Sequence, residues 1–522
     1  MPNAFAMRFR PLLLALILTL PVLPASADAK PPLSAGCSGI VRGVDVDTAT
    51  VLDLQNAMAR RRLTSVDLVK TYLERIKLYD RGPGALNSIR ALNPNALKQA
   101  AALDKERRKG KVRGPLHGIP VLLKDNVGTK DMPTTAGSIA LAGSIPKNDA
   151  TITAKLRNAG AVILGKTNLS EFANWVDLSM PNGYSSLGGQ VVNPYTEGDP
   201  SGSSSGSGVA GAMAFAAVTI GTETSGSILS PSDANSLVGL KPTLGLTSRY
   251  GILPLAPSFD VPGPMVRNVT DARAVLDVIK GVDPKDAATA GANRTLPPLR
   301  KDALKGVRLG VPSANNRPGG AEGTLFANAL KKLQALGATL VETDVLGTAG
   351  LASVTELGLI PNEFKWSLNE YLAAEARPKT GVKTLSDIVA YNKQHPDKVK
   401  YGQRLLEASD ATPGNGVLAT ATATGVVAQA RAVIDAAMLK DDLDAIVEAG
   451  PFNANVGAAA GYPTVIVPMG YVGDSNPSGL AFTGTAWSDG TLLTYAYAYE
   501  QASKLRRSPV ALNPDLKPAK CR

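Results

Sequence analysis

The feature that most constrains the fold of this chain is a run of glycine and serine that leads directly into small apolar residues. Residues 201–208 read Ser-Gly-Ser-Ser-Ser-Gly-Ser-Gly, and the segment from Val209 to Ile220 is almost entirely apolar and rich in alanine. A flexible linker needs only the glycine and serine. The small residues that follow permit one backbone to pack closely against another. We therefore predict that the run lies inside a folded domain.

Short apolar segments alternate with segments of helical periodicity along most of the chain. The expected strands are Ile119–Leu123, Ala161–Leu164, Ala217–Ile220, Val307–Val311, Thr339–Glu342, Ala445–Val447, Thr464–Val467 and Leu480–Phe482. The expected helices begin after the cap-like Thr64 and cover Thr151–Asn158, Ser207–Phe215, Thr270–Lys280, Thr324–Leu336, Ala428–Lys440 and Thr491–Lys504. This alternation predicts an α/β fold with helices on both faces of a sheet. No internal repeat or long linker divides the chain, so residues 30–522 are expected to form a single domain.

The first thirty residues have the features of an export signal. Arg8 and Arg10 precede the apolar run Leu12–Leu23, and Ala25-Ser26-Ala27 supplies small residues at the spacing that a signal peptidase needs. We predict that residues 1–29 are removed and that the mature protein is periplasmic or secreted. A retained N-terminal anchor is the alternative. No later run is expected to be long and apolar enough for a membrane helix, so the mature protein is predicted to have no membrane partner.

Only two cysteines are present, Cys37 and Cys521, near opposite ends of the mature chain. In an exported protein an even number of cysteines is readily oxidised, and chain ends often lie close together on a compact domain. A Cys37–Cys521 disulfide is predicted, and two unpaired thiols are an alternative that the sequence leaves open. Two cysteines so far apart do not provide a structural zinc site, and no metal is expected.

The formal net charge of +11 raises the question of an anionic partner. The basic clusters at residues 60–62 and 105–109 lie on polar helix faces and contain no interleaved aromatic residues. A solvated surface accounts for such clusters better than a nucleic-acid site does. No nucleic-acid partner is therefore expected.

Two short motifs inside the run lack the context that their chemistry requires. Residues 206–211 match GxGxxG, but a Ser-rich loop and not a strand precedes them. Residues 202–206 match the GxSxG of α/β-hydrolases, in which a strand precedes the motif and the catalytic histidine follows late in the chain. The chain has two histidines, of which His117 precedes every candidate serine and His395 lies in a polar segment. An α/β-hydrolase-type esterase is kept only as an alternative.

A serine hydrolase with so little histidine needs another base, and lysine can take that role. Lys124 directly follows the apolar segment Ile119–Leu123, and sites in α/β proteins gather at strand ends. A lysine with an ordinary pKa of about 10.4 is protonated at neutral pH. Burial lowers that pKa and makes the amine available as a base. Lys124 is therefore the candidate base, and an ordinary surface lysine is the alternative.

The lysine segment and the Gly/Ser run together resemble the amidase signature family. The matching segments are Gly114–Asn126, Ser201–Pro231, Val238–Thr243, Gly263–Met265 and Ala460–Pro463, within a resemblance that extends from about Val46 to Pro509. Within the family the chain is most similar to bacterial peptide amidases, through residues 188–190, 193–195, 221–224 and 401–403. This resemblance implies a mixed central β-sheet with helices on both faces, and no metal or organic cofactor.

The resemblance also implies a Ser–cis-Ser–Lys triad that cleaves an amide through an acyl-enzyme. Carried over by motif, Lys124 is the base, Ser203 is the bridging serine after a cis peptide bond, and Ser227 is the nucleophile. The backbone N–H groups expected to hold the oxyanion are those of Thr224, Ser225, Gly226 and Ser227.

Several positions depart from the family pattern. Ser201 and Ser225 stand where glycine is usual, and Leu229 and Ser230 occupy the place of an arginine found in many members. A site without that cation is predicted to prefer neutral substrates, such as peptide C-terminal amides or aryl amides, over carboxylates. The candidate pocket residues are Trp175 and Tyr184, and for both of them a place in the core is the alternative.

Two other functions are compatible with the same motifs. The amidotransferase subunit that supplies ammonia to charged tRNA works in the cytoplasm with partner subunits, whereas the N-terminal segment predicts export. A non-catalytic binding protein would not need all three triad residues. We therefore expect an amidase, monomeric or homodimeric, that acts on a small-molecule or peptide amide.

Overall fold

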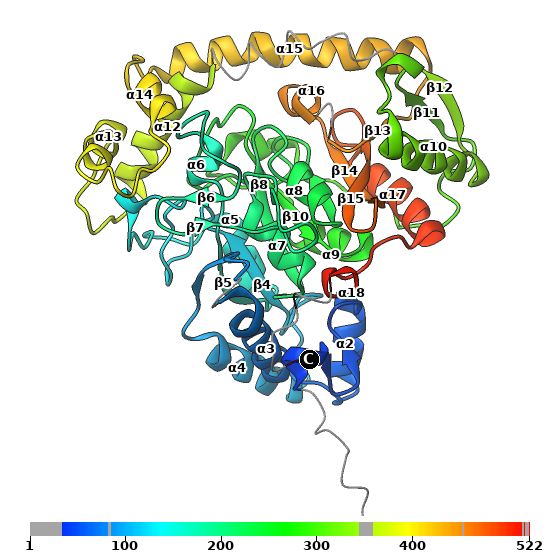
Figure 1. Cartoon of the computed structure of the whole chain (residues 1–522), viewed down its shortest axis with the longest axis horizontal. Helices are drawn as coiled ribbons and strands as arrows, with labels where there is room; N and C mark the ends of the chain where they lie inside the picture. Colours follow the sequence, from blue (N-terminus) through cyan, green and yellow to red (C-terminus); the bar gives the residue numbers. More distant parts are fainter. Residues whose placement is uncertain are drawn as a thin grey trace, which may run out of the picture. The chain divides into compact units, whose positions relative to one another are not determined.

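A mixed sheet of 11 strands runs through the protein in the order β12-β11-β13-β15-β14-β9-β10-β8-β4-β5-β3 (Figure 1). Its strands are β3 Ile89–Leu92, β4 Pro120–Lys124, β5 Val162–Thr167, β8 Val218–Glu223, β9 Val238–Lys241, β10 Val261–Val266, β11 Arg308–Val311, β12 Thr339–Glu342, β13 Ala445–Ala449, β14 Thr464–Val472 and β15 Asn476–Thr483. Each predicted strand is present, with bounds shifted by a few residues. The predicted α/β fold with a mixed sheet flanked by helices is confirmed.

The computed structural model describes residues 34–81, 85–343, 359–451 and 454–513, together with Leu516 and Cys521. The predicted export signal, residues 1–29, lies outside this part of the chain. From Ala35 onward the chain forms one compact unit.

The helices that pack against the sheet or against its flanking helices come from the whole length of this unit. They are α2 Val51–Ala59, α3 Ser65–Arg75, α4 Ala96–Arg108, α5 Thr151–Asn158, α7 Ser205–Ala212, α8 Leu229–Ala234, α9 Val269–Ile279, α10 Gly320–Ala335 and α17 Asp489–Ser503. The predicted cap at Thr64 is confirmed, because its side chain accepts a hydrogen bond from the N–H of Asp67 while the Asp67 side chain bonds back.

A second group of helices packs around its own hydrophobic cluster, which contains Phe172, Leu253, Phe364 and Ile434. Its members are α6 Glu171–Asn174, α12 Ile360–Ala374, α13 Leu385–Lys393, α14 Arg404–Asp410, α15 Gly416–Lys440 and α16 Ala454–Ala459. Of α15 only the part from Ala428 onward was predicted from the sequence, and α12 to α14 were not predicted. The early part of α15 consists of Thr, Ala, Gly and Val with a single Leu, and its helical periodicity is weak.

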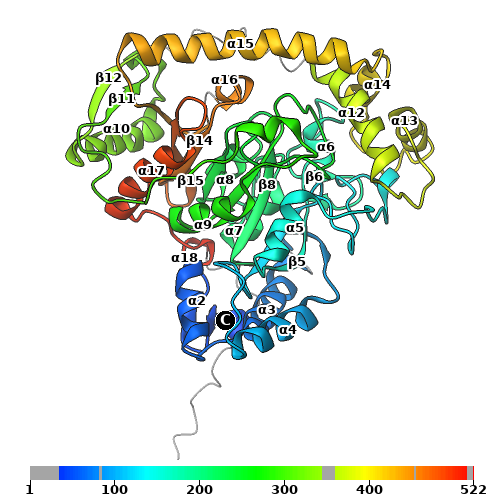
Figure 2. The ribbon, with the colours of Figure 1, turned by 180° about the vertical axis from the view of Figure 1, so that it is seen from behind.

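Helix α15 is 25 residues long and apolar enough, by length and composition, to cross a membrane. The expectation that no later segment meets these criteria was therefore wrong. In the structure one face of α15 packs on protein through Ala419, Ala423, Val426, Ala430, Ile434 and Met438. Figures 1 and 2 show α15 extending from the α12–α14 group towards β11 and β12.

The Gly/Ser run forms the entry to α7, all of whose residues are buried. Helix α7 packs against β4, β5 and β8. A Cβ atom on Gly206 would lie 2.4 Å from the carbonyl oxygen of Asn168 and 2.5 Å from that of Ser88. Only glycine permits this approach of two backbones, and the prediction that the run belongs to the folded interior is confirmed.

Strands β4 and β8 lie side by side in parallel, with Leu123 opposite Ile220. All residues of both strands are buried. Because the carboxyl ends of parallel neighbours share one edge of a sheet, Lys124 at the end of β4 lies beside the loop that leaves β8 after Glu223. This pairing positions the candidate site.

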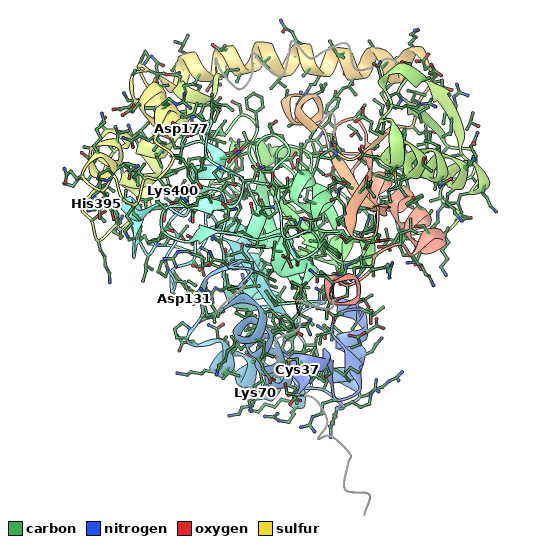
Figure 3. All side chains as sticks on the ribbon, in the orientation of Figure 1. Cys37, Lys70, Asp131, Asp177, His395 and Lys400 are labelled. Atoms are coloured by element: carbon green, nitrogen blue, oxygen red, sulfur yellow. A yellow bond between two sulfur atoms is a disulfide. The ribbon has the colours of Figure 1, made fainter. Side chains whose placement is uncertain are left out.

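Cys37 of α1, Ala35–Ser38, is joined to Cys521 by a disulfide, with Cα atoms 5.3 Å apart. Helix α1 packs against α3, and Figure 3 labels Cys37 together with Lys70 of α3.

Candidate active site

Three residues from separate parts of the chain form one line of hydrogen bonds. The Lys124 Nζ lies 2.8 Å from the Oγ of Ser203, which in turn lies 3.0 Å from the Oγ of Ser227. Lys124 ends β4, Ser203 precedes α7, and Ser227 lies in the loop after β8. All three side chains are buried. The fold thus brings together the three residues that the sequence analysis selected.

The environment of Lys124 favours its neutral form. Burial of the amine lowers the pKa of Lys124 from 10.5 to about 7, although the negative charges of Asp260 and Glu223 act in the opposite direction. Among the described residues no carboxylate lies within ion-pair distance of this amine. Burial therefore favours the free base of Lys124.

Thr222 makes two contacts with the same amine. The Lys124 Nζ lies 3.2 Å from the carbonyl oxygen of Thr222 and 3.0 Å from its Oγ1. The Thr222 Oγ1 also accepts a hydrogen bond of 2.9 Å from the Nδ2 of Asn126. A neutral amine has two N–H groups and one lone pair. If Thr222 accepts both N–H groups, the lone pair points to the hydroxyl of Ser203.

The serine run holds Ser203 in place from both sides. The peptide bond between Gly202 and Ser203 is cis. The carbonyl oxygen of Ser203 accepts a hydrogen bond of 3.1 Å from the N–H of Ser170. On the next residue, the N–H of Ser204 donates to the carbonyl oxygen of Ser227 at 3.2 Å, which ties the two serine segments together.

Residues 224–228 connect β8 to α8 and contain Ser227, and we call them the nucleophile loop. The buried carboxylate of Glu223 organises this loop. Its Oε2 accepts hydrogen bonds from the N–H groups of Ile228, at 2.8 Å, and Leu229, at 3.0 Å. The N–H of Gly226 also bonds to this carboxyl group, and Gly226 has the positive φ of 79° that glycine tolerates. Among the described residues no acceptor is found for the backbone N–H of Ser227. This N–H group is therefore available to donate a hydrogen bond to a bound molecule.

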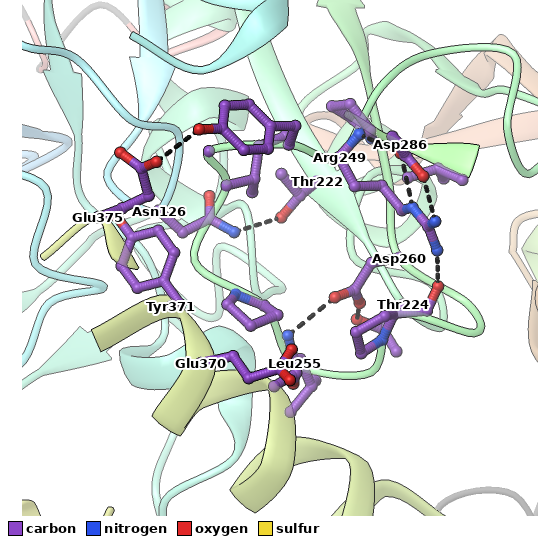
Figure 4. A pocket seen from close by; sticks show the side chains of 18 of the residues that line it. Asn126, Thr222, Thr224, Arg249, Leu255, Asp260, Asp286, Glu370, Tyr371 and Glu375 are labelled. Carbon is purple, nitrogen blue, oxygen red and sulfur yellow. Dashed lines mark hydrogen bonds and ion pairs between the residues drawn. The ribbon is translucent and has the colours of Figure 1, made fainter. Parts of the chain in front are cut away.

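A cavity of about 440 Å³ adjoins the line of hydrogen bonds at Thr222 and Thr224 (Figure 4). Its walls come from the segments at 249–262 and 285–287 and from one face of α12. The polar side chains that line it are Asn126, Thr222, Thr224, Arg249, Tyr250, Lys285, Asp286, Asp260, Ser367, Glu370, Tyr371 and Glu375. An organic molecule can thus lie next to the base, enclosed by both aliphatic and polar groups.

Most charges around this cavity are held by hydrogen bonds within the protein. Arg249 forms an ion pair with Asp286. Asp260 accepts the hydroxyl of Thr224 at 2.5 Å and two backbone N–H groups. Glu375 accepts the hydroxyl of Tyr250 at 2.6 Å. Asp260 and Glu375 therefore accept hydrogen bonds from neutral donors. The walls of the cavity contain four carboxyl groups, those of Asp260, Asp286, Glu370 and Glu375, and two cationic side chains, those of Arg249 and Lys285.

The sequence matches the amidase family over residues 67–493. The chain belongs to this family. A probable amidase of Arabidopsis thaliana is 40% identical over 482 residues, which cover 89% of this chain and 92% of the plant protein. The native peptide amidase of Stenotrophomonas maltophilia is 41% identical, covers 88% of this chain and 98% of that chain, and superposes with a TM-score of 0.80. A glutamyl-tRNA(Gln) amidotransferase subunit of Symbiobacterium thermophilum is 33% identical, and the match covers 86% of this chain and 96% of that protein.

The activity of this amidase is the hydrolysis of carboxamides, as its family and its similarity to peptide and plant amidases establish. The amidotransferase subunits are relatives on the same fold, but the plant and fungal amidases agree better with the function predicted from the sequence. Among the described residues no group of three or more His, Cys, Asp and Glu side chains is arranged to hold a metal.

Two predicted pocket residues of the amidase do not line the cavity beside Thr222. Trp175 is buried in the helical cluster and donates from its indole N–H to the Oγ of Ser409 at 3.0 Å. Tyr184 packs edge-on against Tyr401, with ring centroids 4.8 Å apart. Neither ring lines this cavity, and a role for either residue elsewhere in the substrate site stays a prediction.

Neither histidine of the amidase takes part in the site. His117 is buried, and its Nε2 lies 3.0 Å from the carbonyl oxygen of Leu103. His395 stacks on Tyr391 beside α13, towards the edge of the molecule shown in Figure 3. The inference that a base other than histidine is needed agrees with this arrangement.

Three residues of the amidase site were not selected from the sequence: Asn126, Thr222 and Glu223. Thr222 and Glu223 lie within residues 221–224, which were noted as part of the resemblance but were given no role. Asn126 lies two positions after Lys124 in the lysine segment. These residues could have been selected from the sequence because they lie next to the proposed base or next to the nucleophile loop.

Proposed function

We propose that this amidase cleaves neutral carboxamides with Ser227 as the nucleophile, Ser203 as a proton relay and Lys124 as the base. The observation that carries the proposal is the unbroken line of hydrogen bonds of 2.8 and 3.0 Å from the amine through one hydroxyl to the other. The lowered pKa of Lys124 supports the role of this residue as a base near neutral pH.

In the acylation step the Oγ of Ser227 attacks the carbonyl carbon and passes its proton to Ser203, whose own proton moves to Lys124. The oxyanion is held by backbone N–H groups among the residues predicted for this role, 224–227, of which Gly226 also donates to Glu223. The C–N bond then breaks as the proton returns from Lys124 through Ser203 to the leaving nitrogen. Water attacks the resulting ester by the reverse proton path and releases the carboxylic acid.

We propose neutral amides as the substrates because two features disfavour carboxylates. The positions after the nucleophile that carry arginine in many relatives are Leu229 and Ser230 in this chain. The cavity next to Thr222 contains Asp260 and Glu375, which face neutral donors. The peptide amidase of Stenotrophomonas maltophilia, at 41% identity, supports peptide C-terminal amides as one class.

We also propose that the amidase is exported after removal of residues 1–29 and that it acts without a nucleic-acid or membrane partner, as a monomer or homodimer. The basic n-region, the apolar run and the Ala25-Ser26-Ala27 segment support export. Export argues against the role of an amidotransferase subunit. Mass spectrometry of the protein from the periplasm or medium of its native host would give a mature N-terminus near Asp28 to Lys30, and an unprocessed N-terminus would contradict this assignment.

A hydrolysis panel tests the proposed function. The panel contains a peptide amide, an aryl amide, a fatty amide and the acidic amide malonamate, and product ammonia or aniline is measured against a Ser227→Ala control. We expect hydrolysis of the neutral amides and little or none with the control. Faster hydrolysis of malonamate than of every neutral amide would contradict the proposed preference.

A further inference from the structure

We propose that Ala173 is a specificity-determining residue of the amidase. A left-handed turn presents its small side chain to the cavity next to Thr222 and leaves room there for a bulky apolar acyl group. The proposal rests on the proposed function, because it concerns the acyl half of a substrate bound at the same site. It goes beyond that function by naming a residue outside the triad that sets the size of the acyl group.

Residues 172–174 of α6 have an unusual backbone conformation. The φ and ψ angles are 48° and 41° at Phe172 and 57° and 38° at Ala173, and φ is 74° at Asn174. This left-handed conformation costs free energy for residues other than glycine, which normally adopt it one at a time. Among the described residues no other three consecutive non-glycine residues have a positive φ. Strain of this kind persists only where the surroundings enforce it, and it is concentrated at functional sites.

Aromatic side chains on both sides of Ala173 anchor the turn in the hydrophobic cluster of the second group of helices. Phe172 is buried and packs edge-on against Phe364 of α12, with ring centroids 5.7 Å apart. The N–H of Phe172 also donates to the carbonyl oxygen of Ala136 at 3.0 Å. Trp175 is buried in the same cluster. The chain is thus fixed before and after Ala173, which is half-buried and lines the cavity.

The turn is also tied to the proposed relay serine. The N–H of Ser170 donates to the carbonyl oxygen of Ser203 at 3.1 Å, and the carbonyl oxygen of Ser170 accepts the N–H of Asn174 at 3.3 Å. The Oγ of Ser170 accepts the N–H of Gly183 at 2.8 Å. Ser170 thereby joins the turn to the backbone of Ser203. Ala173 therefore forms a wall whose position relative to the proposed proton relay is fixed.

The part of the cavity wall that contains Ala173 is apolar. Leu255 and Tyr371 line the same cavity and belong to the hydrophobic cluster against which Ala173 packs. Figure 4 shows the paired side chains of Arg249 and Asp286 across the cavity from Tyr371. An apolar wall favours an apolar group. Because alanine contributes only a methyl group, the geometry points to an acyl half that carries a bulky apolar substituent, such as an aromatic ring.

A matched pair of substrates tests the proposal. 3-Phenylpropanamide and propanamide share the primary amide and differ only in the phenyl group of the acyl half. For the wild-type enzyme we expect kcat/KM to be at least about tenfold higher for 3-phenylpropanamide. Ala173→Asn should reduce this ratio about tenfold, because asparagine adopts the left-handed conformation readily and its larger polar side chain occupies the space for the phenyl group. The value for propanamide should change by less than about threefold.

Ala173→Gly is the second test variant and changes the wall in the opposite direction. Glycine adopts the left-handed conformation without steric cost, so the turn is retained. Loss of the methyl group enlarges the cavity. The variant should raise kcat/KM for the bulkier 3,3-diphenylpropanamide relative to 3-phenylpropanamide by about threefold or more. An unchanged ratio would contradict the proposal even if Ala173→Asn does not fold.

Asn174→Ala is the matched control. Asn174 belongs to the same turn, but it is exposed and does not line the cavity. The substitution changes the strain of the turn and leaves the cavity wall as it is. The ratio of kcat/KM for 3-phenylpropanamide and propanamide should therefore stay within about twofold of the wild-type ratio. An equal fall of the ratio in Asn174→Ala and Ala173→Asn would assign the effect to the turn and overturn the proposal.

Equal kcat/KM values for 3-phenylpropanamide and propanamide in the wild-type enzyme would overturn the proposal and leave the proposed function intact. The same holds if Ala173→Asn lowers both values by one factor, since a merely structural role would have that effect. If the folded wild-type enzyme hydrolyses neither compound nor any other amide of the panel, the proposed function itself fails and the proposal for Ala173 fails with it.

Discussion

The Oγ1 of Thr222 lies 3.0 Å from the Nζ of Lys124, and the carbonyl oxygen of the same threonine lies 3.2 Å from that atom. One residue at the end of β8 thus contacts the amine at the end of β4 through two acceptors. The arrangement leaves the lone pair of a neutral lysine for the hydroxyl of Ser203. We regard Thr222 as a positioning residue for the base.

Replacement of Thr222 by valine removes Oγ1 and retains the shape of the side chain. We expect kcat to fall about 10- to 100-fold, because the lone pair of the Lys124 amine is less well oriented towards the hydroxyl of Ser203. KM should change little. Thr153→Val is the control, since Thr153 is also buried and donates to a backbone carbonyl, on α5 away from the site. Equal kcat values for the two variants would argue against a positioning role for Thr222.

The rate of hydrolysis should depend on the protonation state of Lys124. Only the neutral amine accepts a proton, and the pKa of Lys124 is lowered to about 7. The value of kcat/KM should therefore rise about tenfold per pH unit below pH 7 and level off above it. A profile measured with a neutral amide between pH 5 and 10 checks this, and an inflection near the ordinary lysine pKa of about 10.4 would contradict it.

The two serines should differ in the step that each supports. Ser227→Ala removes the nucleophile, and we expect kcat to fall about 10⁴- to 10⁶-fold with no acyl-enzyme. Ser203→Ala breaks the relay, and we expect a loss of about 10²- to 10⁴-fold. Mass spectrometry with an activated ester should still trap acylated Ser227 in the Ser203→Ala variant. Trapping at Ser203 in the Ser227→Ala variant at the wild-type rate would reverse the assignment.

Glu223→Gln tests the link between the nucleophile loop and the base. The loss of one charged acceptor for the N–H groups of Ile228 and Leu229 should lower kcat about tenfold. The negative charge of Glu223 raises the pKa of Lys124, so its removal should move the inflection of the pH profile to lower pH. A shift to higher pH would show that the charge does not act on Lys124 in this way.

The disulfide between Cys37 and Cys521 should stabilise the fold without affecting catalysis. It closes a loop with a sequence separation of 484 residues. Its removal is expected to cost about 3–5 kcal/mol of unfolding free energy. The Cys37→Ser/Cys521→Ser variant should unfold at a lower temperature than the wild type while retaining its kcat at 25 °C. Reductant should lower the unfolding temperature of the wild type but not that of the variant.

Local patterns in the sequence were sufficient to predict the elements that carry the candidate triad. An apolar run of strand length ends at Lys124, and small residues follow Ser203, so the strand and the close-packed helix were both expected. The scarcity of histidine directed attention to a lysine base. The pairing of Lys124 with both serines came from the family resemblance, since spacing along the chain does not determine which loops meet.

By itself the sequence determined the periodicity of individual segments, the helix cap at Thr64, and the residue types available for chemistry. Only the tertiary structure decided that Tyr371 of α12 lines the same cavity as Asn126. It also decided that Trp175 packs in the hydrophobic cluster of the second group of helices. The physical reason is that secondary structure depends on neighbours within a few residues. Burial, and with it the pKa of Lys124, depends on surfaces contributed by strands and helices far apart in the chain.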